Sequence, residues 1–386
     1  MSDTCIVLID GKNMLYRHHF VGRLLTRDDG HPTGAIHGCL NSLASLSNRL
    51  PDASFVWVWD GDGDTWRHKV MAGAAETTSF DMPDDDEELD DDFVNTMVTS
   101  SMSFLGINAF NAEKSRAKKP KKKGYKGQRV QATMQRDPKD KYPTDEKSRA
   151  IIQIPVLRLI LRGIGIRECQ VHGLECDDLI AMLAKRIFEL DKHADVIIHS
   201  GDKDFYQLLP DVRIMTRLQE GKLQWVNAED VLERFGVSVV DWVKYRALTG
   251  DSSDNIPHLW KVGPKTAKRM LDHGLDASEP DYRKLDPSCF TTFARYFQPH
   301  GPEKLWGAVH GNYILSKLVS DIDSPFLSDS VKKDLSKLFD KLDSVRRFRS
   351  RQSVKTTENY RKVNFLLAQY ELNEVMGRLD ELWQIR

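Results

Sequence analysis

The chain has 386 residues, of which 40% are hydrophobic and 29% are charged, and its formal net charge is −1. This length allows one large domain with additions or two domains, and the composition is ordinary for a globular protein. No stretch approaches the roughly 18 consecutive apolar residues of a membrane span, and no basic segment precedes the N-terminal apolar run, so we expect a cytoplasmic protein.

Three apolar runs end at carboxylates: CIVLI before Asp10, FVWVW before Asp60 and VIIHSG before Asp202. Near-continuous apolar runs are typical of strands buried on both faces of a parallel sheet. Helical patterns over 36–49 and 178–190 lie between them, and this alternation predicts an α/β fold with a central, mainly parallel sheet flanked by helices. Ligands bind beyond the carboxyl ends of such strands, although any one of these aspartates could instead be a loop or cap residue.

The charge is unevenly distributed along the chain. Residues 81–92 contain nine acids, and residues 114–129 contain nine basic residues and no acid. Such blocks are typical of solvated or disordered segments, but a basic block also suits phosphates. We interpret 68–120 as an insertion, and we hypothesise that its acidic run competes with DNA for the basic run.

The rest of the chain is predicted to be mainly helical. Short helices separated by turns are expected over 227–275, and after an irregular stretch the pattern becomes helical over 331–345 and 358–384. The five cysteines are scattered without a CxxC pair, and no HExxH or HxH spacing occurs. Neither a disulfide framework nor a zinc finger fits this pattern, and hard, oxygen-liganded Mg²⁺ or Mn²⁺ is the metal we expect rather than zinc.

A further carboxylate group opens the segment GLECDDLIAML. Glu175 and Asp178 are three residues apart and hence neighbours on one helix face, with Asp177 beside them. Acids in a first turn also suit the helix dipole, so a helix-start role is the alternative interpretation.

Two pairs of aspartates follow, Asp202 with Asp204 and Asp251 with Asp254, the second in a sequence that also suits an Asx turn. Carboxylates that are brought together repel one another unless cations neutralise them. Two Mg²⁺ ions about 4 Å apart are a common solution for phosphodiester cleavage.

With these motifs in order, the chain resembles the 5′ nuclease family of flap endonucleases, bacterial polymerase I 5′ nuclease domains and phage 5′-3′ exonucleases. The matching segments are IDGKNMLYR (9–17), WDG (59–61), YKGQR (125–129), GLECDDLIAMLA (173–184), SGDKDFYQLL (200–209), and TGDSSDNIP with VGPKTAKRML (249–270). The resemblance implies a PIN-like nuclease core with a two-metal site that takes Mg²⁺ or Mn²⁺. The implied metal ligands are Asp10, Asp60, Glu175, Asp177, Asp178, Asp202, Asp204, Asp251 and Asp254.

The resemblance also implies DNA contacts outside the metal site. Lys126 and Arg129 would project from a helical arch toward the scissile phosphate as catalytic cations, and Tyr125 would stack on a terminal base. Arg17, on the helix expected after the first strand, would be a further phosphate contact. The alternative interpretation, solvated surface lysines, suits residues 118–123 better than Lys126.

Residues 255–274 resemble the family's helix-three-turn-helix, which holds duplex DNA, often with K⁺. Gly263 is expected to form a tight turn before a helix whose free N–H groups, with Lys265 and Lys268, meet phosphates. This chain departs from the family at His258 and Lys261, where the usual hairpin has glycines. That departure leaves K⁺ binding open.

Three domains are predicted: a nuclease core over 1–226 with an arch at 121–150, a helix-three-turn-helix DNA-binding subdomain over 227–275, and a mostly helical C-terminal extension over 276–386. We expect a free-standing, monomeric, phage-like 5′-3′ exonuclease or flap endonuclease acting on DNA 5′ ends, flaps or RNA-DNA hybrids in replication. The alternative is a nucleic-acid-binding replication accessory protein with structural carboxylates. A nucleotide-binding enzyme is disfavoured because no GxGxxG or GxxxxGK[ST] follows a strand.

Overall fold

The computed structural model describes residues 4–75, 142–217, 223–252, 254, 256–259, 262–279, 281–284, 302–349 and 355–385. They form two compact units. The sheet unit contains the described residues up to 63, those between 142 and 227, and those from 319 onward. The helical unit contains the described residues over 64–75 and 228–318.

A six-stranded sheet with the order β3-β2-β1-β4-β5-β6 forms the centre of the sheet unit. The strands are β1 (Cys5–Asp10), β2 (Ala53–Val58), β3 (Arg167–Cys169), β4 (Asp195–His199), β5 (Arg213–Arg217) and β6 (Leu223–Val226). Neighbours from β3 to β5 pair in parallel, and only β6 runs antiparallel to its neighbour. The predicted mainly parallel sheet is confirmed. All six residues of β2 are buried, as expected for a strand covered on both faces.

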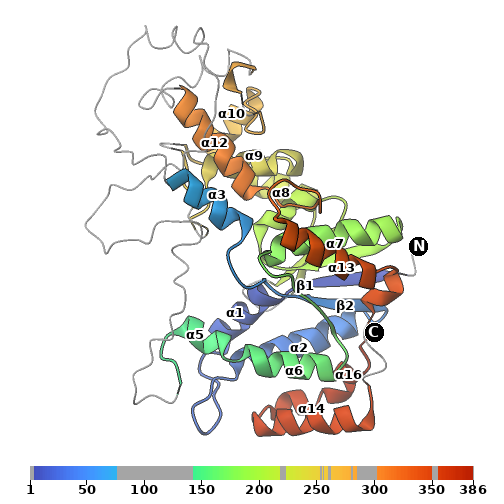
Figure 1. The fold of residues 1–386 in the computed structure, drawn as a ribbon. Coiled ribbons are helices and arrows are strands. Elements are labelled where there is room, and N and C mark those ends of the chain that lie inside the picture. The colour runs from blue at the N-terminus through green and yellow to red at the C-terminus, as the bar shows by residue number, and fades with distance from the viewer. Residues whose placement is uncertain are drawn as a thin grey trace. The chain divides into compact units, whose positions relative to one another are not determined.

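Helices cover both faces of this sheet (Figure 1). They are α1 (Gly11–Val21), α2 (Gly34–Arg49), α5 (Glu146–Ile151), α6 (Ile154–Gly163) and α7 (Cys176–Leu190). Val7, Ile9, Phe55 and Trp57 belong to the same buried cluster as the apolar residues of α2 and α6, whereas α7 lies across the opposite face. Because successive strand residues point to opposite faces, each strand contributes to two hydrophobic layers.

The C-terminal part of the sheet unit is helical, as predicted, but it is more interrupted. It contains α13 (Asp329–Lys341), a 3₁₀ turn (Val345–Phe348), α14 (Thr357–Gln369), α15 (Asn373–Met376) and α16 (Leu379–Trp383). The helical stretch expected over 358–384 breaks at Glu371, whose φ of 57° is incompatible with a right-handed helix. Val363, Leu367 and Leu382 join the cluster under α2 and α6, so this segment completes the core.

The helical unit contains α3 (Trp66–Ala75), α8 (Ala228–Phe235), η2 (Val239–Asp241), α9 (Trp242–Thr249), α10 (Pro264–Asp272), η3 (Tyr282–Lys284) and α12 (Pro302–Ser316). Helix α9 packs against both α10 and α12. The buried guanidinium of Arg67 donates to the carbonyls of Leu315 at 2.9 Å and Lys317 at 3.0 Å, which caps the end of α12.

The first residues of the expected insertion, 68–75, belong to α3, and its remainder lies outside the described residues. Among the helices of the described ranges, none has the length and apolar character required to cross a membrane.

Candidate metal centre

Three predicted ligands lie at the carboxyl edge of the sheet. Asp10 is the last residue of β1, Asp60 follows β2, and Asp202 follows β4. Strand β1 pairs with both β2 and β4, so the three carboxylates follow three adjacent strands. The strand order reverses direction between β1 and β4, and parallel sheets of this type bind ligands at such a point.

Asp10 is 4% exposed and accepts three hydrogen bonds. The backbone N–H of Asn13 donates to Oδ1 at 3.0 Å, the hydroxyl of Ser200 donates to Oδ2 at 2.8 Å, and the thiol of Cys176 points at Oδ1 from 3.7 Å. Burial raises the pKa of Asp10 to about 6, and the charges of Asp202 and Asp60 raise this pKa against the lowering effect of the Asn13 and Ser200 hydrogen bonds. The negative charges of Asp202 and Asp60 therefore act on a buried carboxylate.

Asp60 is held between a backbone N–H and a lysine. The N–H of Cys176 donates to Asp60 Oδ1 at 2.9 Å, and Lys12 Nζ lies 2.8 Å from Oδ2. Cys176 is the first residue of α7, and burial raises the pKa of its thiol well above the ordinary value, with the charges of Asp10, Asp60 and Asp177 adding to the effect. This thiol therefore stays protonated and donates rather than binding a metal as a thiolate.

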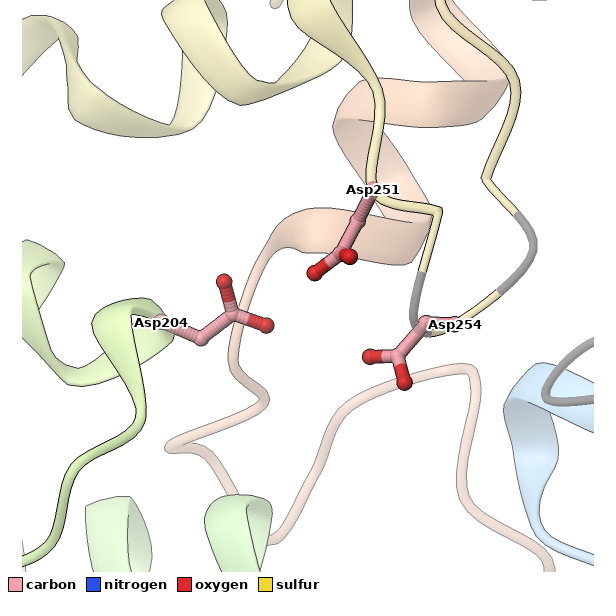
Figure 2. A group of neighbouring side chains, drawn as sticks. All are labelled: Asp204, Asp251 and Asp254. Atoms are coloured by element: carbon pink, nitrogen blue, oxygen red, sulfur yellow. The ribbon is translucent and has the colours of Figure 1, made fainter. Parts of the chain in front are cut away.

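Hydrogen bonds from backbone N–H groups to side-chain oxygens fix the turn after β4. Ser200 Oγ accepts the N–H of Asp202 at 3.0 Å, and Asp202 Oδ1 accepts the N–H of Asp204 at 3.0 Å. Asp202 thereby caps the 3₁₀ helix η1 (Lys203–Leu208). Asp204 lies in the first turn of this helix and is labelled in Figure 2. Asn13 of α1 accepts the N–H of Gly201 at 3.3 Å, which ties this turn to the helix that follows Asp10.

The three acids at the start of α7 do not behave alike. Glu175 takes the N-cap position and is 4% exposed, and Asp177 lies close enough to affect the Cys176 thiol. Asp178 is fully buried, and its Oδ1 accepts the backbone N–H of Val319 at 2.8 Å. This carboxylate therefore anchors the segment that begins at Val319.

The second predicted pair of aspartates, Asp251 and Asp254, belongs to the helical unit. Asp251 and Asp254 lie in the loop after α9, and they offer carboxylate oxygens within 4.8 Å of one another (Figure 2). Asp251 forms an antiparallel bridge with Ile256 and an ion pair with Arg246, while Asp254 is 5% exposed. The tight loop keeps the two carboxylates together.

The structure describes some of the predicted DNA contacts. A Cβ added at Gly201 would lie 2.8 Å from Arg17 Nη2, so the Arg17 guanidinium packs beside the Asp202 turn. Lys265 is exposed, whereas Lys268 forms an ion pair with Asp272 at 2.6 Å.

Gly263 caps α10, although its φ of −94° is not the left-handed conformation of a glycine turn. The predicted contacts Tyr125, Lys126 and Arg129 lie outside the described residues, and so does Lys261, at which the chain departs from the family hairpin.

Sequence reasoning missed Lys12, Ser200 and Cys176, which contact the carboxylates. All three lie inside the motifs that were singled out, but nothing in a motif shows which neighbouring strand its polar residues reach.

The donors in this region suit a hard divalent cation. The described carboxylates at the sheet edge supply oxygen atoms, and the negative charges of Asp202 and Asp60 oppose ionisation of Asp10. A cation there would relieve this repulsion.

Comparison with known proteins gives a match to a protein family. The sequence profile of the family described as 5′-3′ exonuclease, N-terminal resolvase-like domain, matches residues 5–76 and 92–236. That is more than half of the chain. Residues 77–91, which contain most of the acidic run, fall outside the match.

Two curated relatives illustrate the range of similarity. A DNA polymerase I from Pseudomonas aeruginosa is 28% identical over 286 residues, which are 74% of this chain and 24% of that protein. A 5′-3′ exonuclease from Aquifex aeolicus is 27% identical over 345 residues, which are 88% of this chain and 91% of that protein. The chain thus spans about a quarter of the polymerase and most of the exonuclease.

Solved structures share the fold. The T5 D15 protein co-crystallised with metal ions is matched with a TM-score of 0.57 at 16% identity, over 88% of this chain and 99% of that one. A bacteriophage T5 D15 flap endonuclease in a pseudo-enzyme-product complex with DNA and metal ions is matched with a TM-score of 0.56 at 17% identity, over 89% and 99%. The predicted fold is confirmed by these matches.

Proposed function

Because the chain belongs to the family of 5′-3′ exonucleases with the N-terminal resolvase-like domain, we propose that it is a divalent-metal-dependent nuclease that hydrolyses phosphodiester bonds near the 5′ ends of DNA. The observation that carries this proposal is the convergence of Asp10, Asp60 and Asp202 at the carboxyl ends of three adjacent strands. A fold that only bound DNA would gain nothing from the repulsion that these carboxylates create.

We assign the metal-binding role chiefly to five carboxylates of the sheet unit, and Mg²⁺ or Mn²⁺ is the ion. They are Asp10, Asp60, Glu175, Asp177 and Asp202. Asp204, Asp251 and Asp254 are proposed for a second ion from the family resemblance alone. Asp178 is assigned a positioning role, since it is fully buried and its Oδ1 holds the Val319 N–H.

The chain's own residues orient these oxygens and receive the substrate. Ser200 fixes Asp10 Oδ2, and the Cys176 N–H fixes Asp60 Oδ1, so neither carboxylate rotates freely. A bound divalent ion would lower the pKa of a coordinated water and stabilise charge on the leaving oxygen. Arg17 and, by resemblance, Lys126 would neutralise the phosphate.

The proposed substrates are DNA with free 5′ ends or flaps and the RNA strand of hybrids, as in primer removal during replication. Duplex DNA would be held at the N-terminus of α10, where the first N–H groups of the helix and exposed Lys265 suit a phosphate. A K⁺ ion in this hairpin belongs to the same proposal.

The test is cleavage of a 5′-labelled flap duplex and a matched blunt duplex by the wild-type chain in Mg²⁺ and in EDTA. We expect cleavage that requires the ion, with product lengths distinguishing end trimming from cutting at the branch. Repeating the reaction with an RNA 5′ segment defines the sugar preference. Tight DNA binding without any metal-dependent product would contradict the proposal and favour an accessory protein.

A further inference from the structure

Lys12 occupies an unusual place for a cation. It is in the first turn of α1, where the helix dipole disfavours positive charge, and this turn contains no acid. Its ammonium instead reaches Asp60, which follows a different strand, at 2.8 Å. The side chain is 44% exposed, so the ammonium could be solvated and does not need this contact for its own burial.

The contact involves one particular oxygen of Asp60. Oδ1 is held by the N–H of Cys176 at the start of α7, and Oδ2 is the atom next to the lysine. A metal ion that binds Asp60 through Oδ2 therefore shares or takes over the oxygen that Lys12 contacts. The N–H on Oδ1 keeps the carboxylate from turning away to avoid this competition.

The charges around Asp60 determine how the Lys12–Asp60 ion pair affects metal binding. Asp60 and Asp202 both lie close enough to Asp10 for their negative charges to act on it, and Lys12 reduces the local negative charge at Asp60. A positive charge beside the carboxylates weakens the binding of any further cation by direct repulsion.

We propose that Lys12 competes with the divalent ion for Asp60 and so sets the apparent metal affinity of the enzyme. The inference rests on the proposed function, because it assumes that Asp60 is a metal ligand. By linkage, metal binding weakens the Lys12–Asp60 ion pair by the same factor as the ion pair weakens metal binding.

The test is isothermal titration of the DNA-free protein with Mn²⁺, with the wild type beside Lys12→Met and Lys12→Arg. Lys12→Met should lower the dissociation constant about threefold to tenfold, in line with loss of one partly solvated charge next to the ligand. Lys12→Arg retains the charge and should stay near the wild type. Lys362→Met, which removes an ion pair with Glu358 on α14, is the matched control and should change nothing.

The outcomes separate the inference from the function on which it rests. Unchanged or weaker Mn²⁺ binding in Lys12→Met, with binding still lost in Asp60→Asn, would overturn the competition alone. Mn²⁺ binding that survives Asp60→Asn unaltered would contradict the metal assignment itself. Circular dichroism of each variant establishes that the compared proteins are folded.

Discussion

Replacing Asp10 with Asn removes a buried negative charge, and this charge lowers the stability of the folded state. Burial, with the charges of Asp202 and Asp60, raises the pKa of Asp10 from 3.8 to about 6, so the native state retains a proton that the unfolded chain has lost. Without a divalent ion, the stability contribution of this group is present in full below about pH 4 and falls as the pH rises through 6. A shift of about two pKa units corresponds to on the order of 3 kcal/mol.

Urea unfolding in EDTA between pH 4 and 7.5 measures this effect as the difference between Asp10→Asn and the wild type. The asparagine resembles the protonated acid in shape. The variant should therefore not lose stability at this site as the pH rises through 6. Its free energy of unfolding relative to the wild type should therefore rise by on the order of 3 kcal/mol across that range.

Asp145→Asn serves as the control of opposite sign. Partial burial of Asp145 acts to raise its pKa, but hydrogen bonds from Ser148 prevail and lower it, so the stability contribution of Asp145 is lost as the pH falls. A constant difference between Asp10→Asn and the wild type at every pH would refute the claim that burial and the neighbouring carboxylates raise the pKa of Asp10.

Substitutions at three further positions test the local geometry. Gly11→Ala should destabilise the protein by about 3 kcal/mol or more in urea unfolding, because the added Cβ would lie 2.1 Å from Trp57 Nε1. Gly263→Ala, with no atom within 4 Å of the added Cβ, should cost less than about 1 kcal/mol, and equal losses would contradict the packing argument. Asp178→Asn retains an oxygen for the Val319 N–H and should keep the Mn²⁺ affinity of the wild type, whereas Asp178→Ala should cost about 1–3 kcal/mol of stability. A large loss of Mn²⁺ affinity in Asp178→Asn would show that this carboxylate is a ligand.

The sequence predicted the strands whose composition reflects double-sided burial. β1, β2 and β4 are near-continuous apolar runs, and each was expected in its observed place. Strand β3 was missed because it has only three residues, two of them charged, and its pairing with β2 creates it. Helix α7 begins at Cys176, two residues before the expected start, because Glu175 rather than Asp177 takes the N-cap position.

For the site, the sequence indicated which residues carry the charge but not what holds them. Asp10, Asp60 and Asp202 follow predicted strands, and their proximity required only that these strands be neighbours. The roles of Ser200 and Lys12 depend on atoms that meet across elements far apart in the chain, at 2.8 Å in each case. Pattern and spacing contain no information on such contacts.

The central claim is that the carboxylates at the carboxyl edge of the sheet carry phosphodiester hydrolysis. Asp202 and Asp191 offer a matched pair, since each accepts the backbone N–H two residues ahead at 3.0 Å, but Asp191 precedes β4 and Asp202 follows it. The decisive measurement is the single-turnover rate of cleavage of a 5′-labelled flap duplex in Mg²⁺ by Asp202→Asn and Asp191→Asn. We expect a loss of about a hundredfold or more for Asp202→Asn and a wild-type rate for Asp191→Asn. Wild-type cleavage by Asp202→Asn would contradict the account.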